Sequence, residues 1–142
     1  MADEAVIIEL FNGGRPVRYT VANGAAGTDI PKGSIMELTS SRTMVLNTGA
    51  GKVIAGILAH EKVGGDGSTT ATVWTDGIFQ LKTLAGTGST TLGSYVRTAG
   101  AAGATINHIT VCTTLDQETG KSIGRALNTA GAAADALIRV NL

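Results

Sequence analysis

The sequence predicts an all-β fold, built as either a sandwich or a barrel. Short segments rich in Val, Ile, Thr and Tyr recur along the 142 residues, and clusters of Gly, Ser, Thr, Asp and Asn separate them, which is the spacing typical of these architectures. Most of the twenty glycines fall between such segments, where a positive φ costs glycine little. No segment carries a long apolar stripe with the 3.6-residue period of a helix. By its length the chain is one domain, large enough to bury a core.

Six of the expected strands lie in the first half of the chain. Turn residues bound each of them, and their β-branched and aromatic residues favour an extended conformation. Pro16 cannot donate a hydrogen bond to a ladder, so it predicts a strand start or a sheet edge. Pro31 and Gly33 predict a turn ahead of the next strand. The six strands are expected over residues 6–11, 15–21, 34–38, 43–46, 53–59 and 70–75.

The second half of the chain contains five more expected strands. Asp76 and Gly77 predict a two-residue hairpin turn between the strands on either side of them. Residues 115–122 and the alanine-rich residues 126–137 are predicted to be loops, because each contains a glycine and neither has a helical apolar stripe. The second of these loops has room for one helical turn. The five strands are expected over residues 77–82, 94–98, 105–113, 122–127 and 136–141.

The sequence contains an internal echo. Residues 54–75 and residues 122–142 each give a strand, a loop of small residues and then an alternating strand, with Gly56 and Gly124 at similar places. Two related β-units packed into one barrel would explain this similarity.

The charge balance argues against several classes of partner. Eleven Lys and Arg balance eleven Asp and Glu, and both signs are scattered along the chain, unlike the charge distribution of a nucleic-acid or membrane-surface binder. The acidic N-terminus and the short apolar runs predict neither an export signal nor a membrane span. We therefore expect a soluble, unprocessed protein with no nucleic-acid or membrane partner. Cys112, the single cysteine, rules out an intrachain disulfide and is expected to be a small buried hydrophobe.

No stretch of the sequence has the spacing of a catalytic, cofactor or metal site. Residues 47–56 ("NTGAGKVIAG") superficially match a phosphate-binding loop, but Leu46 and Val53 stand where that motif needs a Gly and a Ser or Thr. A β-like run follows, so a turn between two strands is predicted. His60 and His108 have no partners at metal-ligand spacing, and His108 is expected to face solvent from a strand. No serine lies in a nucleophile elbow. We expect no enzyme activity, no cofactor and no metal.

The aromatic residues allow two interpretations. Trp74 and Phe79 lie five residues apart and are expected to close one end of a β core. The alternative is a carbohydrate-binding module that uses Trp74, Tyr95 or Tyr19 as stacking faces. Exposed aromatic rings gathered on one surface would favour the second interpretation, and buried rings would oppose it.

Six segments carry strand motifs in a particular order, and the first five of them contain a glycine. They are "DIPKGSIMEL" (29–38), "IAGILAHE" (54–61), "ATVWTDGIFQL" (71–81), "TLGSYVRTAG" (91–100), "KSIGRAL" (121–127) and "ALIRVNL" (136–142). In this order they resemble the phage capsid cement, or head decoration, proteins. The resemblance runs from residue 15 to residue 142. It departs from the family pattern at residues 104–120, where shorter members have a brief loop.

The resemblance implies a small β-barrel or β-tulip-like domain without catalysis or cofactor. It implies a homotrimer that sits at three-fold or quasi-three-fold positions on the outer capsid surface of a virion, after synthesis in the host cytoplasm. The implied partners are the major capsid protein, the other copies of the trimer and neighbouring cement subunits. The domain division expected on this basis is an N-terminal arm over residues 1–14 and a β-barrel decoration domain over residues 15–142.

The N-terminal segment is the candidate binding element. Residues 4–11 ("EAVIIELF") form a β-prone strip, and Gly13 and Gly14 follow it and would let it swing away from the barrel. Such an arm can add as a strand to an exposed sheet edge of a neighbouring chain. The alternative left open is that the segment forms the first strand of the protein's own sheet. The residues expected to contact the major capsid protein or an adjacent cement subunit are Ala5, Val6, Ile7, Ile8, Glu9, Leu10 and Phe11.

Overall fold

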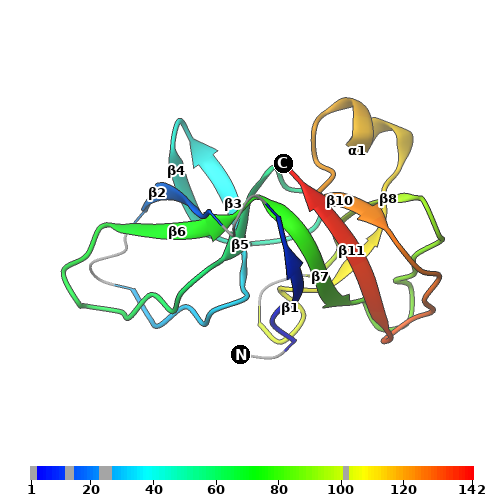
Figure 1. Ribbon diagram of the computed structural model, residues 1–142, viewed down its shortest axis with the longest axis horizontal. Coiled ribbons are helices and arrows are strands. Elements are labelled where there is room, and N and C mark those ends of the chain that lie inside the picture. The colour runs from blue at the N-terminus through cyan, green and yellow to red at the C-terminus, as the bar shows by residue number, and fades with distance from the viewer. Residues whose placement is uncertain (1–2, 12–14, 23–26, 101–102) are drawn as a thin grey trace.

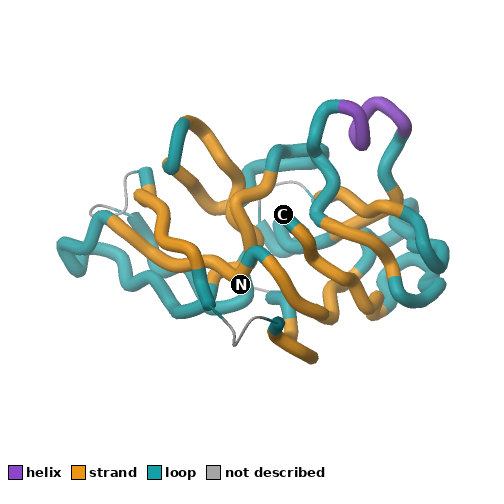
Figure 2. The backbone as a smooth tube through the Cα atoms, turned by 45° about the horizontal axis from the view of Figure 1, so that its top comes forward, coloured by secondary structure: helices purple, strands orange, loops and turns teal. Residues whose placement is uncertain are grey.

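The computed structural model describes residues 3–11, 15–22, 27–100 and 103–142. Within these ranges the chain is almost entirely β, and Figure 2 shows strands and loops with one short helix. This confirms the all-β fold class and includes the expected barrel. The elements in chain order are β1 (Val6–Leu10), β2 (Val17–Val21), β3 (Ile35–Ser40), β4 (Thr43–Leu46), β5 (Ile54–Leu58), β6 (Thr70–Trp74), β7 (Asp76–Lys82), β8 (Tyr95–Thr98), β9 (Ile109–Val111), α1 (Thr114–Glu118), β10 (Gly124–Ala126) and β11 (Asp135–Asn141).

The strands form two sheets that lie side by side (Figure 1). The first is a closed barrel in the order β2-β4-β3-β5-β6, on the left of the view. The second is a six-stranded sheet in the order β1-β7-β11-β10-β8-β9, on the right. Each of the eleven expected strands corresponds to one of these elements. The largest difference between an expected and an observed strand is at residues 105–113, where β9 occupies only Ile109–Val111.

Both sheets repeat one pattern of strand pairing. In the barrel β3 pairs with β4 and β5, and β6 pairs with β5 and β2. In the second sheet β8 pairs with β9 and β10, and β11 pairs with β10 and β7, in the same antiparallel sense. The parallel pairing of β2 with β4 also has a counterpart, a parallel bridge from Thr83 to Ile109 that brings the chain after β7 beside β9.

The internal echo in the sequence is therefore confirmed, because β5 and β6 occupy the places that β10 and β11 occupy in the other sheet. Gly56 and Gly124 have nearly the same backbone conformation, with φ of +154° and +158°. The expectation that both units share one barrel is wrong, since each unit builds its own sheet. A single residue, Thr75, carries the chain from one unit to the next.

The hairpin predicted at Asp76 and Gly77 is also wrong. β6 pairs with β2 and β5, while β7 begins at Asp76 and pairs with β1 and β11, so the two strands lie in different sheets. Gly77 serves a close approach between strands instead of a turn. A Cβ atom there would lie 2.7 Å from the carbonyl oxygen of Glu9 on β1, closer than real Cβ contacts come.

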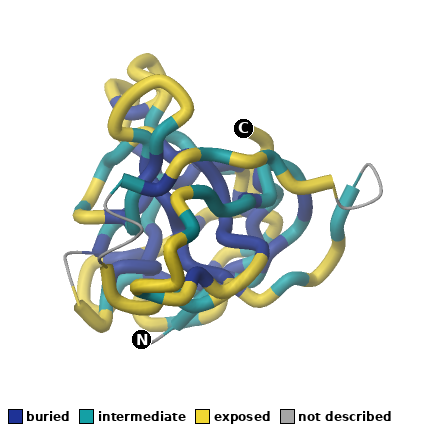
Figure 3. Tube along the Cα trace, turned by 90° about the vertical axis from the view of Figure 1, so that its left-hand side faces the viewer, coloured by how far each residue is buried: buried dark blue, intermediate teal, exposed yellow. Residues whose placement is uncertain are grey.

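The core runs from one sheet into the other. Alternate residues of β7 and β11, among them Phe79 and Ile138, are buried and belong to one cluster with Ile35 and Ile57 from barrel strands. A second cluster, which includes Met36, fills the barrel itself. β3 and β5 thus have buried residues on both faces, which explains why β5 reads as a continuous apolar run. Figure 3 shows the buried segments gathered in the interior and the exposed ones in peripheral loops.

The loop predicted over residues 115–122 is wrong in its first half, where α1 forms. Thr113 caps this short helix, because its hydroxyl accepts a hydrogen bond from the amide of Asp116 at 3.2 Å and its own amide donates to the Asp116 carboxylate at 2.9 Å. This reciprocal capping box satisfies donors that a helix start leaves free. The alanine-rich residues 126–137 contain no helix, as predicted.

The same turn precedes β3, β8 and β11. Its third residue has positive φ in each case, +89° at Gly33, +83° at Gly93 and +54° at Ala133. Gly33 confirms the turn predicted from Pro31 and Gly33. Ala133 is the exception, because a side chain in the left-handed region costs free energy that glycine avoids.

We expect Ala133→Gly to raise the free energy of unfolding by about 1 kcal/mol, because glycine adopts a positive φ without steric strain. Urea denaturation of the two proteins measures the difference. Ala132→Gly is the matched control, since Ala132 is exposed in the same turn without positive φ and should lose stability or stay unchanged. A loss of stability in Ala133→Gly would contradict the expectation.

Candidate functional site

The N-terminal segment lies against the protein's own sheet. β1 pairs antiparallel with β7, and a bulge between Ile7 and Glu9 shifts the register. Ile7 and Leu10 pack on the core, while Val6 and Ile8 are exposed. In the single chain the segment therefore forms the first strand of the protein's own sheet, which is the alternative that the sequence left open. β1 is nevertheless the edge of that sheet, so its outer side is open to a neighbour.

Both ends of this segment are tied down. The amide of Ala5 donates to the carbonyl of Gly33 at 2.9 Å. The ring of Phe11 lies under the guanidinium of Arg139, whose Cζ is 4.2 Å from the ring centroid. The glycines expected to act as a hinge, Gly13 and Gly14, fall outside the described residues.

A small charged network fixes the start of the segment. The Asp3 carboxylate contacts Nε2 of His108 at 2.7 Å and Nζ of Lys82 at 3.2 Å. The hydrogen bond from His108 lowers the pKa of Asp3. The prediction that His108 faces solvent is wrong, because the residue is only 6% exposed and its Nε2 contacts the Asp3 carboxylate.

The outer face of the six-stranded sheet carries a row of cross-strand neighbours. In register they are Glu9 on β1, Ile78 on β7, Arg139 on β11, Arg125 on β10 and Tyr95 on β8. Two arginines directly opposite each other repel, so each needs compensation. Arg139 obtains it from Asp76, whose Oδ1 lies 2.9 Å from Nη2.

Arg125 is held without a carboxylate among the described residues. Its Nε donates to the carbonyl of Gly93 at 3.2 Å, and its guanidinium lies over the Tyr95 ring, 5.1 Å from the centroid. These contacts leave other N–H groups of the Arg125 guanidinium free to donate to an acceptor. A hollow of about 400 Å³ opens here, lined by Tyr95, Ser122, Gly124, Arg125, Arg139 and Asn141. We call it the Arg125 hollow.

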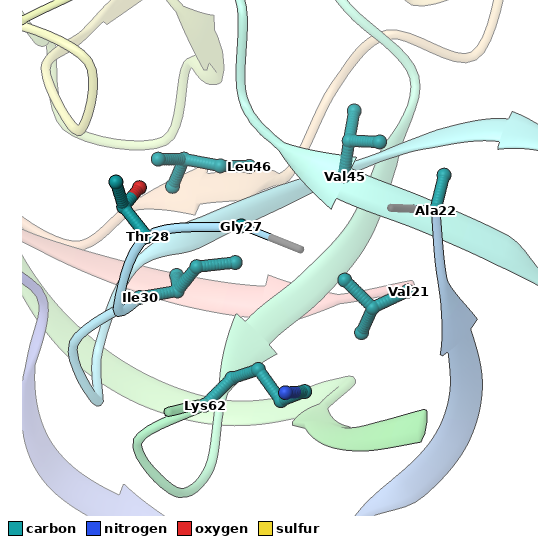
Figure 4. Close-up of a pocket in the computed structure, with 8 residues that line it drawn as sticks. All are labelled: Val21, Ala22, Gly27, Thr28, Ile30, Val45, Leu46 and Lys62. Carbon is teal, nitrogen blue, oxygen red and sulfur yellow. The ribbon is translucent and has the colours of Figure 1, made fainter. Parts of the chain in front are cut away.

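A second hollow lies in the barrel (Figure 4). Its volume is about 180 Å³, below the size of ordinary ligand sites. The stem of Lys62 lines it, but the ammonium of that residue is engaged by Asp66 at 2.6 Å and by the carbonyl of Val63 at 2.7 Å. The lining is otherwise mostly apolar: Val21, Ala22, Gly27, Thr28, Ile30, Val45 and Leu46.

Residues 47–53 connect β4 to β5, and residues 54–56 begin β5, so most of the stretch over residues 47–56 lies between two strands as predicted. Its amides are directed at protein acceptors, because the Thr48 amide donates to the Glu37 carboxylate at 2.8 Å and the Gly51 amide donates to the carbonyl of Thr98 at 2.9 Å. A phosphate-binding loop instead presents its amides to the ligand. This confirms the turn interpretation.

The two histidines considered for a metal site, His60 and His108, do not come together. His60 lines a hollow with Glu61 and Asp66 on the barrel unit, whereas His108 comes directly before β9 of the second sheet. Within the described ranges no group of three or more His, Cys, Asp and Glu side chains could hold a metal ion. In the same ranges no helix is long and apolar enough to span a membrane.

The aromatic residues do not form one surface. Phe79 is fully buried and Trp74 is partly buried against the same core, which confirms the core interpretation for this pair. Tyr19 and Tyr95 lie in different sheets, on β2 and β8, and each has an arginine over its ring. Cys112 is buried as expected, and burial raises the pKa of its thiol.

Sequence patterns predicted contact residues on β1, but they did not predict the Arg125 hollow or the Asp3 network. The outward position of Arg125 could have been read from the alternation of β10, since Arg125 stands between two small inward residues. The position of Arg125 opposite Arg139 and Tyr95 could not have been predicted in this way, because cross-strand neighbours depend on strand register.

Comparison with solved structures shows a likeness in fold to a phage protein. A solved structure described as the crystal structure of head fiber gp8.5 N base in bacteriophage phi29 superposes with a TM-score of 0.53 and 11% sequence identity, over 89% of this chain and 95% of that chain. At this identity the likeness shows a common fold alone. No protein-family model and no curated protein sequence matches the chain.

Proposed function

We propose that this protein is a structural protein of a bacteriophage virion that decorates the outer surface of the head. The observation that carries the proposal is the fold, which matches a phage head fiber base over 89% of this chain and 95% of that one. The order of strand motifs over residues 15–142 supports it independently, because it resembles the head decoration proteins.

In this proposal the protein binds the icosahedral head as a homotrimer at three-fold or quasi-three-fold positions and bridges capsomers. It performs no catalysis and needs no cofactor. The outer side of β1, with Val6 and Ile8 exposed, contacts the major capsid protein or an adjacent subunit. Three linked copies turn the second and third contacts into intramolecular events and so raise avidity. Preferential binding to the assembled shell then stabilises that shell.

The test is binding to heads of the phage whose genome encodes the chain, prepared without this protein. We expect the purified protein to co-sediment with these heads in saturable, stoichiometric amounts. Heads that lack it should release their DNA at a lower temperature than decorated heads. Absence of co-sedimentation together with equal release temperatures would contradict the proposal.

A matched pair of variants tests the contribution of β1. Ile8 lies at the bulge and is exposed, so Ile8→Asp should leave folding intact and weaken co-sedimentation. Leu115 is equally apolar and exposed on α1, and Leu115→Asp should bind heads as the wild type does.

A further inference from the structure

Glu9 on the edge strand β1 and Arg125 on β10 are opposite charges on the outer sheet face, and neither takes part in an ion pair within the described part of the chain. The ion pairs Arg139–Asp76, Arg97–Asp116 and Lys82–Asp3 occupy neighbouring positions of this sheet and its surroundings.

Glu9 and Arg125 cannot pair with each other in one copy. They are three strands apart in the row Glu9, Ile78, Arg139, Arg125. Neighbouring strands lie about 4.8 Å apart, so the separation is roughly 14 Å, which is much longer than a salt bridge.

Each charge is accompanied by exposed apolar side chains. Beside Glu9, Val6 and Ile8 are 53% and 51% exposed. Around Arg125, Tyr95 is 41% and Leu127 is 42% exposed. Arginine and tyrosine side chains surrounded by apolar residues are among those that contribute most to the binding free energy of protein interfaces. The two surfaces are thus complementary in charge and similar in apolar character.

We propose that β1 of one copy docks on the Arg125 hollow of a second copy, where the Glu9 carboxylate binds the Arg125 guanidinium. The hollow of about 400 Å³ has room for a carboxylate side chain. Arg125 is already oriented by Gly93 and by the Tyr95 ring, so little side-chain entropy is lost on binding.

A carboxylate matches the charge of the hollow. Asp76 compensates Arg139, which leaves Arg125 as the one uncompensated cation of the two. A single carboxylate neutralises it in a bidentate arrangement. The net charge of the chain is zero, so no wider positive field favours a polyanion such as nucleic acid.

The contact joins two different surfaces of the same chain, which makes it heterologous, and heterologous contacts generate closed rings when the rotation between copies permits. The inference names the surfaces that join the subunits, and to that extent it rests on the homotrimer of the proposed function.

Charge reversal tests the contact through the mass of the protein in solution, measured by sedimentation over a range of concentrations. We expect the wild type to be oligomeric. Glu9→Arg and Arg125→Glu should each raise the dissociation constant at least tenfold, because each places like charges in contact. The double variant restores opposite charges and should recover most of the wild-type association. Arg18→Glu, at an exposed position of β2 in the barrel, is the control and should associate normally.

Three results would overturn the inference. A wild type that is monomeric at all concentrations removes both the contact and the trimer. Association that neither reversal weakens places the interface elsewhere. Single variants that weaken association without rescue in the double variant exclude the pairing of Glu9 with Arg125. Co-sedimentation of the wild type with heads is measured separately, so failure of the contact is distinguished from failure of the virion role.

Discussion

Gly124→Ala is expected to lower the free energy of unfolding by roughly 3 kcal/mol or more, since it combines overpacking with an unfavourable φ. A Cβ atom at Gly124 would lie 2.0 Å from the carbonyl oxygen of Arg139 on β11 and 3.0 Å from the Cα of Val140. Both are backbone atoms of a paired central strand, so neither can move without breaking the ladder. Denaturant unfolding of the variant measures the loss.

Gly131→Ala is the control for this substitution. Gly131 precedes β11 in the same unit, and a Cβ atom there would meet nothing within 4 Å, so stability should change little. Gly56→Ala should resemble Gly124→Ala, because its Cβ would lie 2.5 Å from the carbonyl oxygen of Trp74 in the equivalent pair of strands. A Gly124→Ala protein as stable as Gly131→Ala would contradict the close approach of β10 and β11.

The strands could be predicted from the sequence because alternation and turn residues are local properties of a chain. The wrong predictions concern sequence patterns that are compatible with two different local structures. Gly77 follows Asp76 as in a hairpin turn, yet it allows β1 to approach β7. Thr113 and Asp116 carry a capping signal, but it introduces only one helical turn, too short to leave an apolar stripe.

The candidate site depends on contacts between residues that are distant in sequence. His108 contacts Asp3, which stands 105 positions earlier. Arg125 faces Tyr95 and Arg139 only because of the register of three strands. Register is set by the complete sheet, since a shift of one residue would turn every side chain to the other face. Local patterns could therefore identify β1 as a candidate but not the hollow on the same face.

Phe79→Ala is expected to destabilise the whole protein by about 3–5 kcal/mol, the range typical of a buried Phe truncated in a core. Phe79 is fully buried on β7, opposite Ile7 of β1 and Ile138 of β11. It packs in the cluster that also contains Ile35 and barrel residues of β5. The loss of its ring should therefore be felt in both sheets.

The single tryptophan makes this consequence measurable. Trp74 lies on barrel strand β6 and packs against the same cluster, so its fluorescence reports on the barrel while circular dichroism reports on all strands. Both signals should shift to the same lower denaturant midpoint in Phe79→Ala, because one cooperative core joins the two units. Ile78→Ala, one residue earlier and on the outer face, should shift neither by much. A lowered dichroism midpoint with an unchanged Trp74 midpoint would mean that the two repeats unfold independently in spite of their shared cluster.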